Sequence, residues 1–218
     1  MTIEIFPTVV PNSLGDIAVA RERFPFAPGL QIDAANGSLA PNTTWIPEPD
    51  EKMPDSAHVM YEAHLMIENP LTAGLSFVRA GAKRVIGHVE AFSNAESARE
   101  TLDMWKKAGA KEVGLGVLLQ TPLESLEPYL DICDFVLFMS IATIGKQGIP
   151  FDERGIERVK LFHKKHSDVP IAVDGGVSET NIKLFVKAGA TRFSVGSAIS
   201  KSDDPAGMYE KLLKLAGV

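Results

Sequence analysis

Short runs of hydrophobic residues, many of them β-branched, alternate along the chain with longer stretches in which apolar residues recur at helical spacing. The short runs predict strands and the longer stretches predict amphipathic helices. The expected strands are residues 3–9, 29–33, 59–66, 84–88, 113–118, 135–139, 170–174 and 192–195. The expected helices lie near residues 14–24, 70–80, 95–108, 123–130, 156–165, 179–188 and 204–215. A strand followed by a helix, repeated along the chain, is typical of a parallel α/β fold.

A short tripeptide repeat supports this organisation. Ala-Gly-Ala occurs at residues 80–82, 108–110 and 188–190, each time where a helical stretch ends and an apolar run begins. Glycine there suits the left-handed residue that closes a helix. The strand–helix units of this 218-residue chain predict a single-domain (β/α)8 TIM barrel over residues 1–218, although a doubly wound open sheet has the same alternation. Residues 34–56 carry four prolines and predict a long loop with a short helix.

Composition narrows the function classes. Hydrophobic residues make up 45% of the chain and charged residues 23%, the balance of an ordinary globular protein. The net charge of -6 argues against a general nucleic-acid binder, but backbone N–H groups can still hold a phosphate. The single cysteine, Cys133, excludes an intrachain disulfide and favours a reducing compartment. With no apolar stretch of membrane-spanning length and no signal peptide pattern, we expect a cytoplasmic protein without a membrane partner.

Polar residues collect where the expected strands end. If the strands form a barrel, these residues meet at the carboxyl-terminal face, where barrel enzymes place their functional groups. Asp33, His64 and Asp174 come from three strands and resemble the mixed nitrogen and oxygen ligands of a divalent transition metal. The alternative is that each side chain only caps a neighbouring loop. The residues at these strand ends are Gln31, Asp33, His64, His88, Ser140, Asp174 and Ser197.

Glycine-containing loops follow the last strands. Residues 173–177 read VDGGV and residues 195–198 read VGSA, so two consecutive strands end in glycine. The loops after strands seven and eight bind phosphate in many barrels, and glycine lets backbone N–H groups approach the anion. A third such loop, TIGKQG at residues 143–148, follows the sixth strand. The alternative is that these glycines only serve turns.

The motifs together resemble the ribulose-phosphate 3-epimerase family. Residues 30–42, LQIDAANGSLAPN, resemble its segment H-x-D-x-M-D-G-x-F-V-P-N, and residues 62–67, EAHLMI, resemble D-x-H-L-M. Residues 137–141, LFMSI, resemble L-L-M-S-V, while 173–177 match V-D-G-G-V in full. Residues 195–199 end in the family's G-S-A-I, and residues 5–9, IFPTV, resemble I-x-P-S-I. The matches span nearly the whole chain in order, and the chain is identified as a divergent member.

The resemblance implies a fold and a reaction. The fold is a TIM barrel of the ribulose-phosphate binding type. The reaction is epimerisation of a ketose phosphate at carbon 3, ribulose 5-phosphate to xylulose 5-phosphate or a close relative, as in the pentose phosphate pathway. Asp33 and Asp174 correspond to the two family aspartates that move the proton between the faces of an enediolate. A divalent metal ion (Zn, Fe, Mn or Co) would be held by Asp33, His64 and Asp174, with Gln31 where the family has a histidine as fourth ligand.

The resemblance also implies the partners and the residues that meet them. The partner is a small phosphorylated sugar, and a homo-oligomer is expected. Met66 and Met139 correspond to methionines that line the intermediate with polarizable surface. His88 lies in HVEA, residues 88–91, which resembles the family's H-x-E-A; it either orients neighbours at the mouth or is structural. The corresponding substrate-binding residues are Thr8, His64, Met66, Met139, Gly145, Gln147, Gly175, Gly176, Gly196 and Ser197.

Departures from the family pattern leave three hypotheses. Gln31, Ala35 and Asn36 replace the usual histidine, methionine and aspartate, and the loop at 142–147 is shorter by about one residue, with Lys146 as a new positive charge. The retained aspartate pair favours a working epimerase. The altered first motif and loop favour another enediolate reaction, such as an aldol-type or decarboxylating step. The lost histidine favours a non-catalytic barrel that binds a sugar phosphate.

Overall fold

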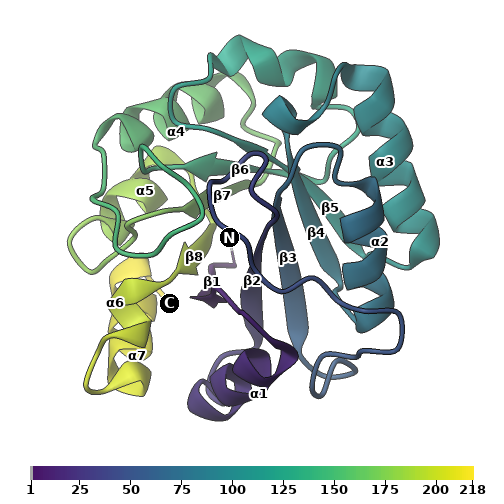
Figure 1. Cartoon of the computed structure of the whole chain (residues 1–218). Coiled ribbons are helices and arrows are strands. Elements are labelled where there is room, and N and C mark those ends of the chain that lie inside the picture. The colour runs from purple at the N-terminus through teal and green to yellow at the C-terminus, as the bar shows by residue number, and fades with distance from the viewer. Residues whose placement is uncertain (1) are drawn as a thin grey trace.

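Eight parallel strands close into a barrel in the computed structural model, which describes residues 2–218 (Figure 1). Each strand pairs with the next one in the sequence, and β1 also pairs with β8. This closure confirms the predicted TIM barrel and excludes the open sheet, which would leave two edges unpaired. The strands are β1 (Glu4–Val9), β2 (Gly29–Ala35), β3 (Met60–Met66), β4 (Arg84–His88), β5 (Glu112–Val117), β6 (Phe135–Met139), β7 (Ile171–Asp174) and β8 (Arg192–Val195).

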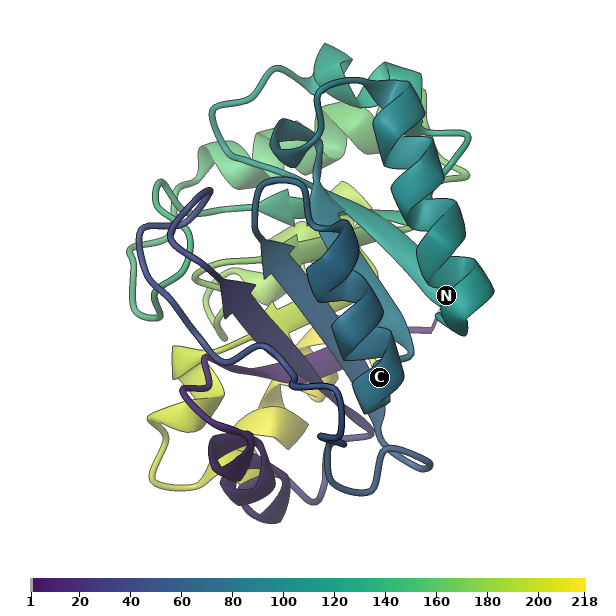
Figure 2. The ribbon, with the colours of Figure 1, turned by 45° about the vertical axis from the view of Figure 1, so that its right-hand side comes forward.

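The helices lie outside the strands, and between β2 and β3 a loop takes the place of a helix (Figures 1 and 2). None of the helices in residues 2–218 is both long and apolar enough to cross a membrane. The α-helices are α1 (Leu14–Arg23), α2 (Leu71–Ala80), α3 (Ala95–Ala108), α4 (Arg154–Lys165), α5 (Ile182–Ala188), α6 (Ser197–Ser200) and α7 (Pro205–Ala216). Two 3₁₀ helices, η1 (Val89–Ala91) and η2 (Leu123–Tyr129), complete the set.

Helix ends follow the sequence signals. Gly81, Gly109 and Gly189 adopt the left-handed conformation at the ends of α2, α3 and α5, as the Ala-Gly-Ala repeat predicts. The helix expected near residues 123–130 is present as the 3₁₀ helix η2, because Pro128 lies inside the segment and has no N–H for an α-helical hydrogen bond. One expectation is wrong. No helix occurs within residues 34–56, where the prolines remove further backbone donors.

Two apolar layers stabilise the fold. The larger layer fills the space between the strands and the surrounding helices, and it includes Trp105, Phe77 and Phe185, all of which are fully buried. The smaller layer lies inside the barrel and is built largely from alternate residues of the strands, because only every second side chain of a strand points inward. It comprises Ala35, Ala40, Met66, Ile86, Phe135, Leu137, Met139, Ile141, Ile144 and Ala172.

A buried ion cluster involves residues at the amino-terminal ends of several strands. Arg84 is only 2% exposed, and its guanidinium donates to Glu62 at 3.0 Å, to Glu112 at 2.7 Å and to Glu4 at 3.1 Å. Arg192 donates to Glu112 at 2.8 Å. Ion pairs therefore occupy the base of the barrel, at the end opposite to the carboxyl ends of the strands.

Candidate active site

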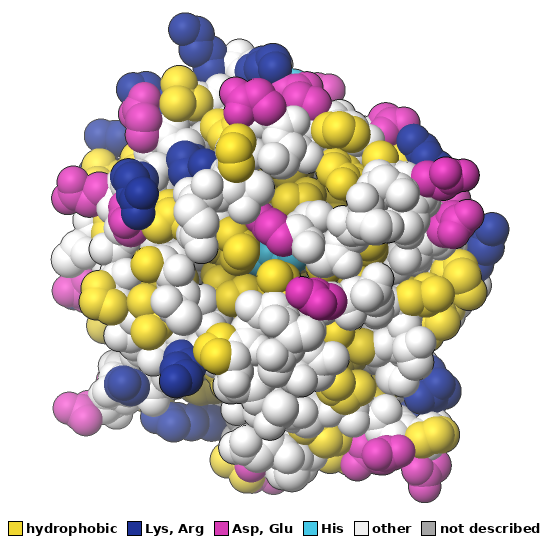
Figure 3. All heavy atoms as spheres, turned by 45° about the horizontal axis from the view of Figure 1, so that its top comes forward, with side chains coloured by type: hydrophobic (Ala, Val, Ile, Leu, Met, Phe, Trp, Pro, Cys, Tyr) yellow, Lys and Arg dark blue, Asp and Glu magenta, His cyan; other side chains and the backbone are white. Residues whose placement is uncertain are grey.

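The pocket at the carboxyl-terminal mouth gathers nearly all the residues singled out in the sequence. Figure 3 shows a face of the molecule where a histidine and acidic side chains lie at the centre, with most lysines and arginines towards the rim. Gln31, His88 and Ser140 are predicted residues that do not line this pocket. The predicted residues that line it are Thr8, Asp33, His64, Met66, Met139, Gly145, Gln147, Asp174, Gly175, Gly176, Gly196 and Ser197.

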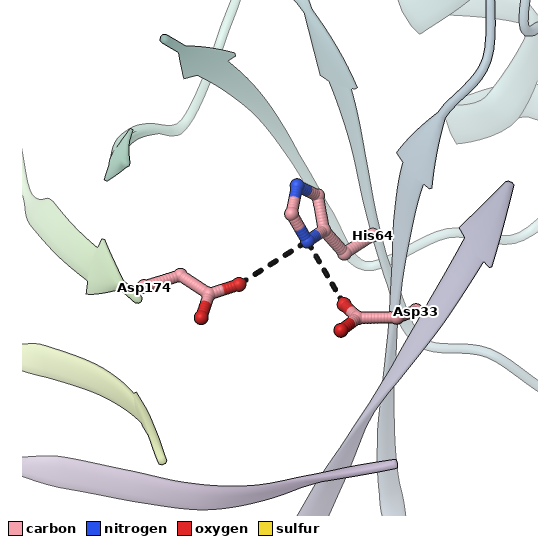
Figure 4. Close-up of side chains that lie close together, drawn as sticks. All are labelled: Asp33, His64 and Asp174. Carbon is pink, nitrogen blue, oxygen red and sulfur yellow. Dashed lines mark hydrogen bonds and ion pairs between the residues drawn. The ribbon is translucent and has the colours of Figure 1, made fainter. Parts of the chain in front are cut away.

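Two carboxylates meet on one ring nitrogen. Nδ1 of His64 lies 3.0 Å from Oδ1 of Asp33 and 3.3 Å from Oδ2 of Asp174 (Figure 4). Asp33 and His64 are paired residues of β2 and β3, whereas Asp174 ends β7 and approaches from the other side of the mouth. The fold thus brings together three side chains that are far apart in the sequence.

Burial and mutual charge set the protonation of this group. Burial raises the pKa of Asp33 to about 6; the negative charge of Asp174 acts in the same direction, and His64 opposes the shift. Burial alone would lower the pKa of His64, but hydrogen bonds to both carboxylates and their negative charges raise it to about 10. At neutral pH the group is therefore an imidazolium held between two carboxylates.

The other ring nitrogen of His64 contacts a second buried histidine. Nε2 of His64 lies 2.7 Å from Nε2 of His88, which ends β4, and both side chains are fully buried. Beyond it, Nδ1 of His88 lies 3.4 Å from Oε2 of Glu90. Glu90 accepts a hydrogen bond from the N–H of Leu118 at 2.9 Å. A line of polar groups therefore runs from the pocket to the loop after β5.

Gln31 lies next to the pocket without forming its wall. Its side chain is fully buried, and its Oε1 accepts a hydrogen bond from the hydroxyl of Thr8 at 3.0 Å. Its Nε2 has no hydrogen-bond partner within residues 2–218. Gln31 is two residues before Asp33 on β2, so the two side chains share the inner face.

Glycines shape the loops after β7 and β8. Gly175 and Gly176 have φ of 105° and 66°, values that residues with a side chain rarely adopt. A Cβ at Gly175 would lie 2.7 Å from Cγ1 of Ile141, and one at Gly176 would lie 2.9 Å from Cβ of Phe151. These positions require glycine, and they leave this part of the pocket wall as bare backbone.

The loop that follows β6 lines the pocket, and the side chain of Gln147 ties it to β1 and α6. Its Nε2 donates to the carbonyl of Thr8 at 2.9 Å, and its Oε1 accepts from the hydroxyl of Ser200 at 3.2 Å. The predicted site residues do not include the apolar lining residues Ile141, Ile149 and Val177, and Lys146 was identified only as a departure from the family pattern. Each lies next to a predicted strand end or glycine, so adjacency to those positions was the available signal.

The donor set fits a divalent metal ion. One ligand atom from each of Asp33, His64 and Asp174 lies within 4.8 Å of the others, and all three residues are buried. Two carboxylate oxygens and one imidazole nitrogen suit zinc, iron, manganese or cobalt, and three protein ligands leave positions open for a substrate.

A closed parallel barrel with titratable side chains at the carboxyl ends of its strands places the chain in the class of (β/α)8 enzymes. Residues 27–200 match the model of the ribulose-phosphate 3 epimerase family. A ribulose-phosphate 3-epimerase of Aquifex aeolicus (strain VF5) is 36% identical over 190 residues, which cover 85% of this chain and 83% of that protein. That of Mycobacterium bovis (strain ATCC BAA-935 / AF2122/97) is 30% identical over 220 residues, covering 98% and 93%. The chain therefore belongs to the ribulose-phosphate 3-epimerase family, a family of isomerases.

Solved structures show the same fold at low sequence identity. The 3-hexulose-6-phosphate synthase from Salmonella typhimurium matches with a TM-score of 0.74 at 18% identity, over 98% of both chains. This similarity supports the barrel assignment alone. The two motif-based expectations, the fold and the family, are thus confirmed by independent comparisons.

Proposed function

We propose that this chain interconverts ribulose 5-phosphate and xylulose 5-phosphate, or a closely related pair of ketose phosphates, by moving a proton at carbon 3. The observation that carries the proposal is the pair of carboxylates from β2 and β7 that approach one point of the mouth from different sides. Epimerisation next to a carbonyl requires such a pair, because the proton leaves one face of the planar enediolate and another returns to the opposite face. Asp33 and Asp174 fill these two roles.

The raised pKa of Asp33 suits this chemistry. A carboxyl group with a pKa near 6 is mostly ionised at neutral pH and still accepts a proton more readily than an ordinary aspartate. In each direction an ionised aspartate accepts the proton from carbon 3, and the other aspartate, which has first taken up a proton from water, donates that proton to the opposite face. After each turnover the two carboxyl groups have exchanged roles, so proton exchange with water resets the site.

A divalent metal ion held by Asp33, His64 and Asp174 would act as a Lewis acid that stabilises negative charge on the enediolate oxygens. Met66 and Met139, which are almost fully buried at the inner end of the pocket, exclude water from the reacting carbon. Gly175, Gly176 and Gly196 offer backbone N–H groups to the phosphate, with the Ser197 hydroxyl beside them. In this proposal the reacting carbon lies at the inner end of the pocket and the phosphate lies near its rim.

Proton exchange in heavy water tests the proposal. The protein is incubated with ribulose 5-phosphate in D2O, with and without Zn2+, Mn2+, Fe2+ or Co2+, and deuterium at carbon 3 is followed by NMR together with xylulose 5-phosphate. Asp33→Asn and Asp174→Asn are each expected to lower interconversion by about 10²–10⁴-fold, the usual contribution of an acid–base group. Asp103→Asn, on the exposed face of α3, is the matched control and retains full activity.

Other results point to the other two hypotheses. Deuterium uptake without xylulose 5-phosphate indicates a different reaction through an enediolate. Binding of ribulose 5-phosphate without exchange under any metal condition indicates a non-catalytic sugar-phosphate barrel. Full activity of both aspartate variants overturns the assignment of the two residues even if the protein is an epimerase.

We also propose that the protein works in a reducing compartment and as a homo-oligomer. Burial raises the pKa of the Cys133 thiol to about 12, so this side chain stays a thiol and has no redox role. Light scattering of the purified protein measures the assembly state, and a monomer at every concentration contradicts the proposed homo-oligomer.

A further inference from the structure

A line of five buried or half-buried groups extends from the pocket in one direction. It runs from the carboxylates of Asp33 and Asp174 to His64, then to His88 and finally to Glu90. His64 and His88 contact each other through their Nε2 atoms at 2.7 Å, with ring centroids 5.0 Å apart. The outer two members of this line, His88 and Glu90, have no place in the proposed proton transfer.

Packing holds the ring of His88 in place. A Cβ at Gly116, the paired residue on β5, would lie 2.8 Å from Cε1 of His88, so only glycine allows the ring to lie against that strand. At the far end, Oε1 of Glu90 accepts from the N–H of Leu118. Its Oε2 and Nδ1 of His88 face each other at 3.4 Å, and neither has another partner within residues 2–218.

The chemistry of these contacts gives the line a direction. Two ring nitrogens at 2.7 Å cannot both carry a proton towards each other, so one of the Nε2 atoms donates and the other accepts. An ionised carboxylate only accepts, so Glu90 requires the proton of His88 on Nδ1. Nε2 of His88 is then the acceptor, and Nε2 of His64 is the donor.

We propose that His88 and Glu90 are positioning residues that fix the protonation pattern of His64, with Nε2–H of His64 donating to His88 and Nδ1 of His64 turned towards Asp33 and Asp174. This inference rests on the proposed function only in treating the pocket as the active site. The protonation pattern of His64 and His88 is a property of the protein without substrate. Second partners of this kind hold a metal-binding imidazole in one tautomer and make its free nitrogen a better ligand.

The proposal predicts an unusual effect of Glu90→Gln. The amide oxygen of the variant remains the acceptor for the Leu118 N–H, so its NH2 group faces Nδ1 of His88 as a donor. The proton of His88 must then move to Nε2, where it faces Nε2 of His64. The direction of the whole line reverses, and the remaining proton of His64 stays on Nδ1, where it blocks a metal ligand.

The test records ¹⁵N-labelled histidine spectra of the metal-free protein, in which directly bonded protons identify the protonated ring nitrogens. The wild type is expected to show His88 protonated on Nδ1 and bare on Nε2, and Glu90→Gln to show the reverse. Co²⁺ titration without substrate is the second measurement, and Glu90→Gln is expected to weaken binding by about 10–100-fold. Glu68→Gln, an exposed glutamate that follows β3, is the matched control for both measurements.

Each result decides the matter. A wild-type His88 protonated on Nε2, or a Glu90→Gln variant with an unchanged His88 pattern, overturns the proposal. Failure of Glu90→Gln to fold leaves the wild-type spectrum as the deciding measurement. Since neither measurement uses substrate, an absence of epimerase activity would overturn the proposed function and leave this test intact.

Discussion

Metal binding at the mouth should release a proton from His64. In the metal-free protein Nδ1 of His64 holds a proton between Asp33 and Asp174, because their charges raise its pKa to about 10. A metal ion bound by the three residues needs the lone pair of that nitrogen. The metal therefore displaces the proton, and raising the pH favours the complex over the free protein.

The size of the effect follows from the two shifted groups. With a pKa of about 10 for His64 and about 6 for Asp33, most molecules at pH 8 carry the imidazolium and the ionised Asp33. Binding then releases about one proton, and the dissociation constant falls about tenfold for each unit from pH 7 to pH 9, or about 1.4 kcal/mol per unit. Below pH 6 the carboxyl of Asp33 also carries a proton, so the dependence steepens towards two protons.

Calorimetry measures this number directly. Mn²⁺ or Co²⁺ is titrated at pH 8 in two buffers with different enthalpies of ionisation, and the change in observed heat divided by the difference in buffer enthalpy gives the protons released. His64→Gln, which carries no titrating ring, is the control and should bind weakly and without the proton release that the imidazolium supplies. Tight binding by the wild type with no proton release, together with a pH-independent dissociation constant from pH 7 to pH 9, would refute the reasoning.

Three further changes probe the rest of the barrel. Gln31→His places an imidazole beside Asp33, and we expect it to tighten Co²⁺ binding at least tenfold, measured by titration. Arg84→Met leaves Glu62 buried without its partner, a loss of about 3–5 kcal/mol, or roughly 6–20 °C in melting temperature at this size. Gly145→Ala puts a Cβ 2.1 Å from Oδ1 of Asn42 at a φ of 89°, so we expect KM to rise about tenfold and the melting temperature to fall by roughly 2–12 °C, the equivalent of about 1–3 kcal/mol of strain.

Each of these has its own contrary result. Unchanged Co²⁺ affinity in Gln31→His shows that this position does not reach the metal. Burial raises the pKa of Glu62, so at a pH above this pKa the ionised side chain destabilises the folded protein when it has no partner. The loss in Arg84→Met should therefore shrink as the pH falls and Glu62 gains a proton; a loss independent of pH contradicts the role of this charge. An unchanged KM for Gly145→Ala shows that the loop tolerates a side chain there.

The sequence predicted the site residues better than it predicted their contacts. Asp33, His64 and Asp174 were found because parallel strands of one barrel end at one face, so distant residues at those ends share a pocket. The contact between His64 and His88 was not found. It depends on how far neighbouring strands are shifted in the closed barrel, which no local pattern contains.

The buried ion cluster at the base shows a signal that was overlooked. Glu62 is two residues before His64 on β3, so a strand that points His64 inward must point Glu62 inward as well. The same rule places Arg84 inside, two positions before another inward residue, Ile86. A buried charge at such a position requires an opposite charge. The alternation of inward and outward side chains along β3 and β4 therefore predicts the ion cluster, although hydrophobic periodicity does not.

The two charged ends of the barrel interior differ in the cation that each one uses. At the base, Arg84 and Arg192 pair with glutamates, and a guanidinium keeps its proton at any ordinary pH, so the positive charge there is permanent. At the mouth, the cation between Asp33 and Asp174 is an imidazolium, which can release its proton. The apolar inner layer lies between the two clusters. The same barrel thus holds one arrangement of charge that only stabilises and another that can exchange a proton for a metal ion. The difference lies in the cation, which is the imidazolium of His64 at the mouth and a guanidinium at the base.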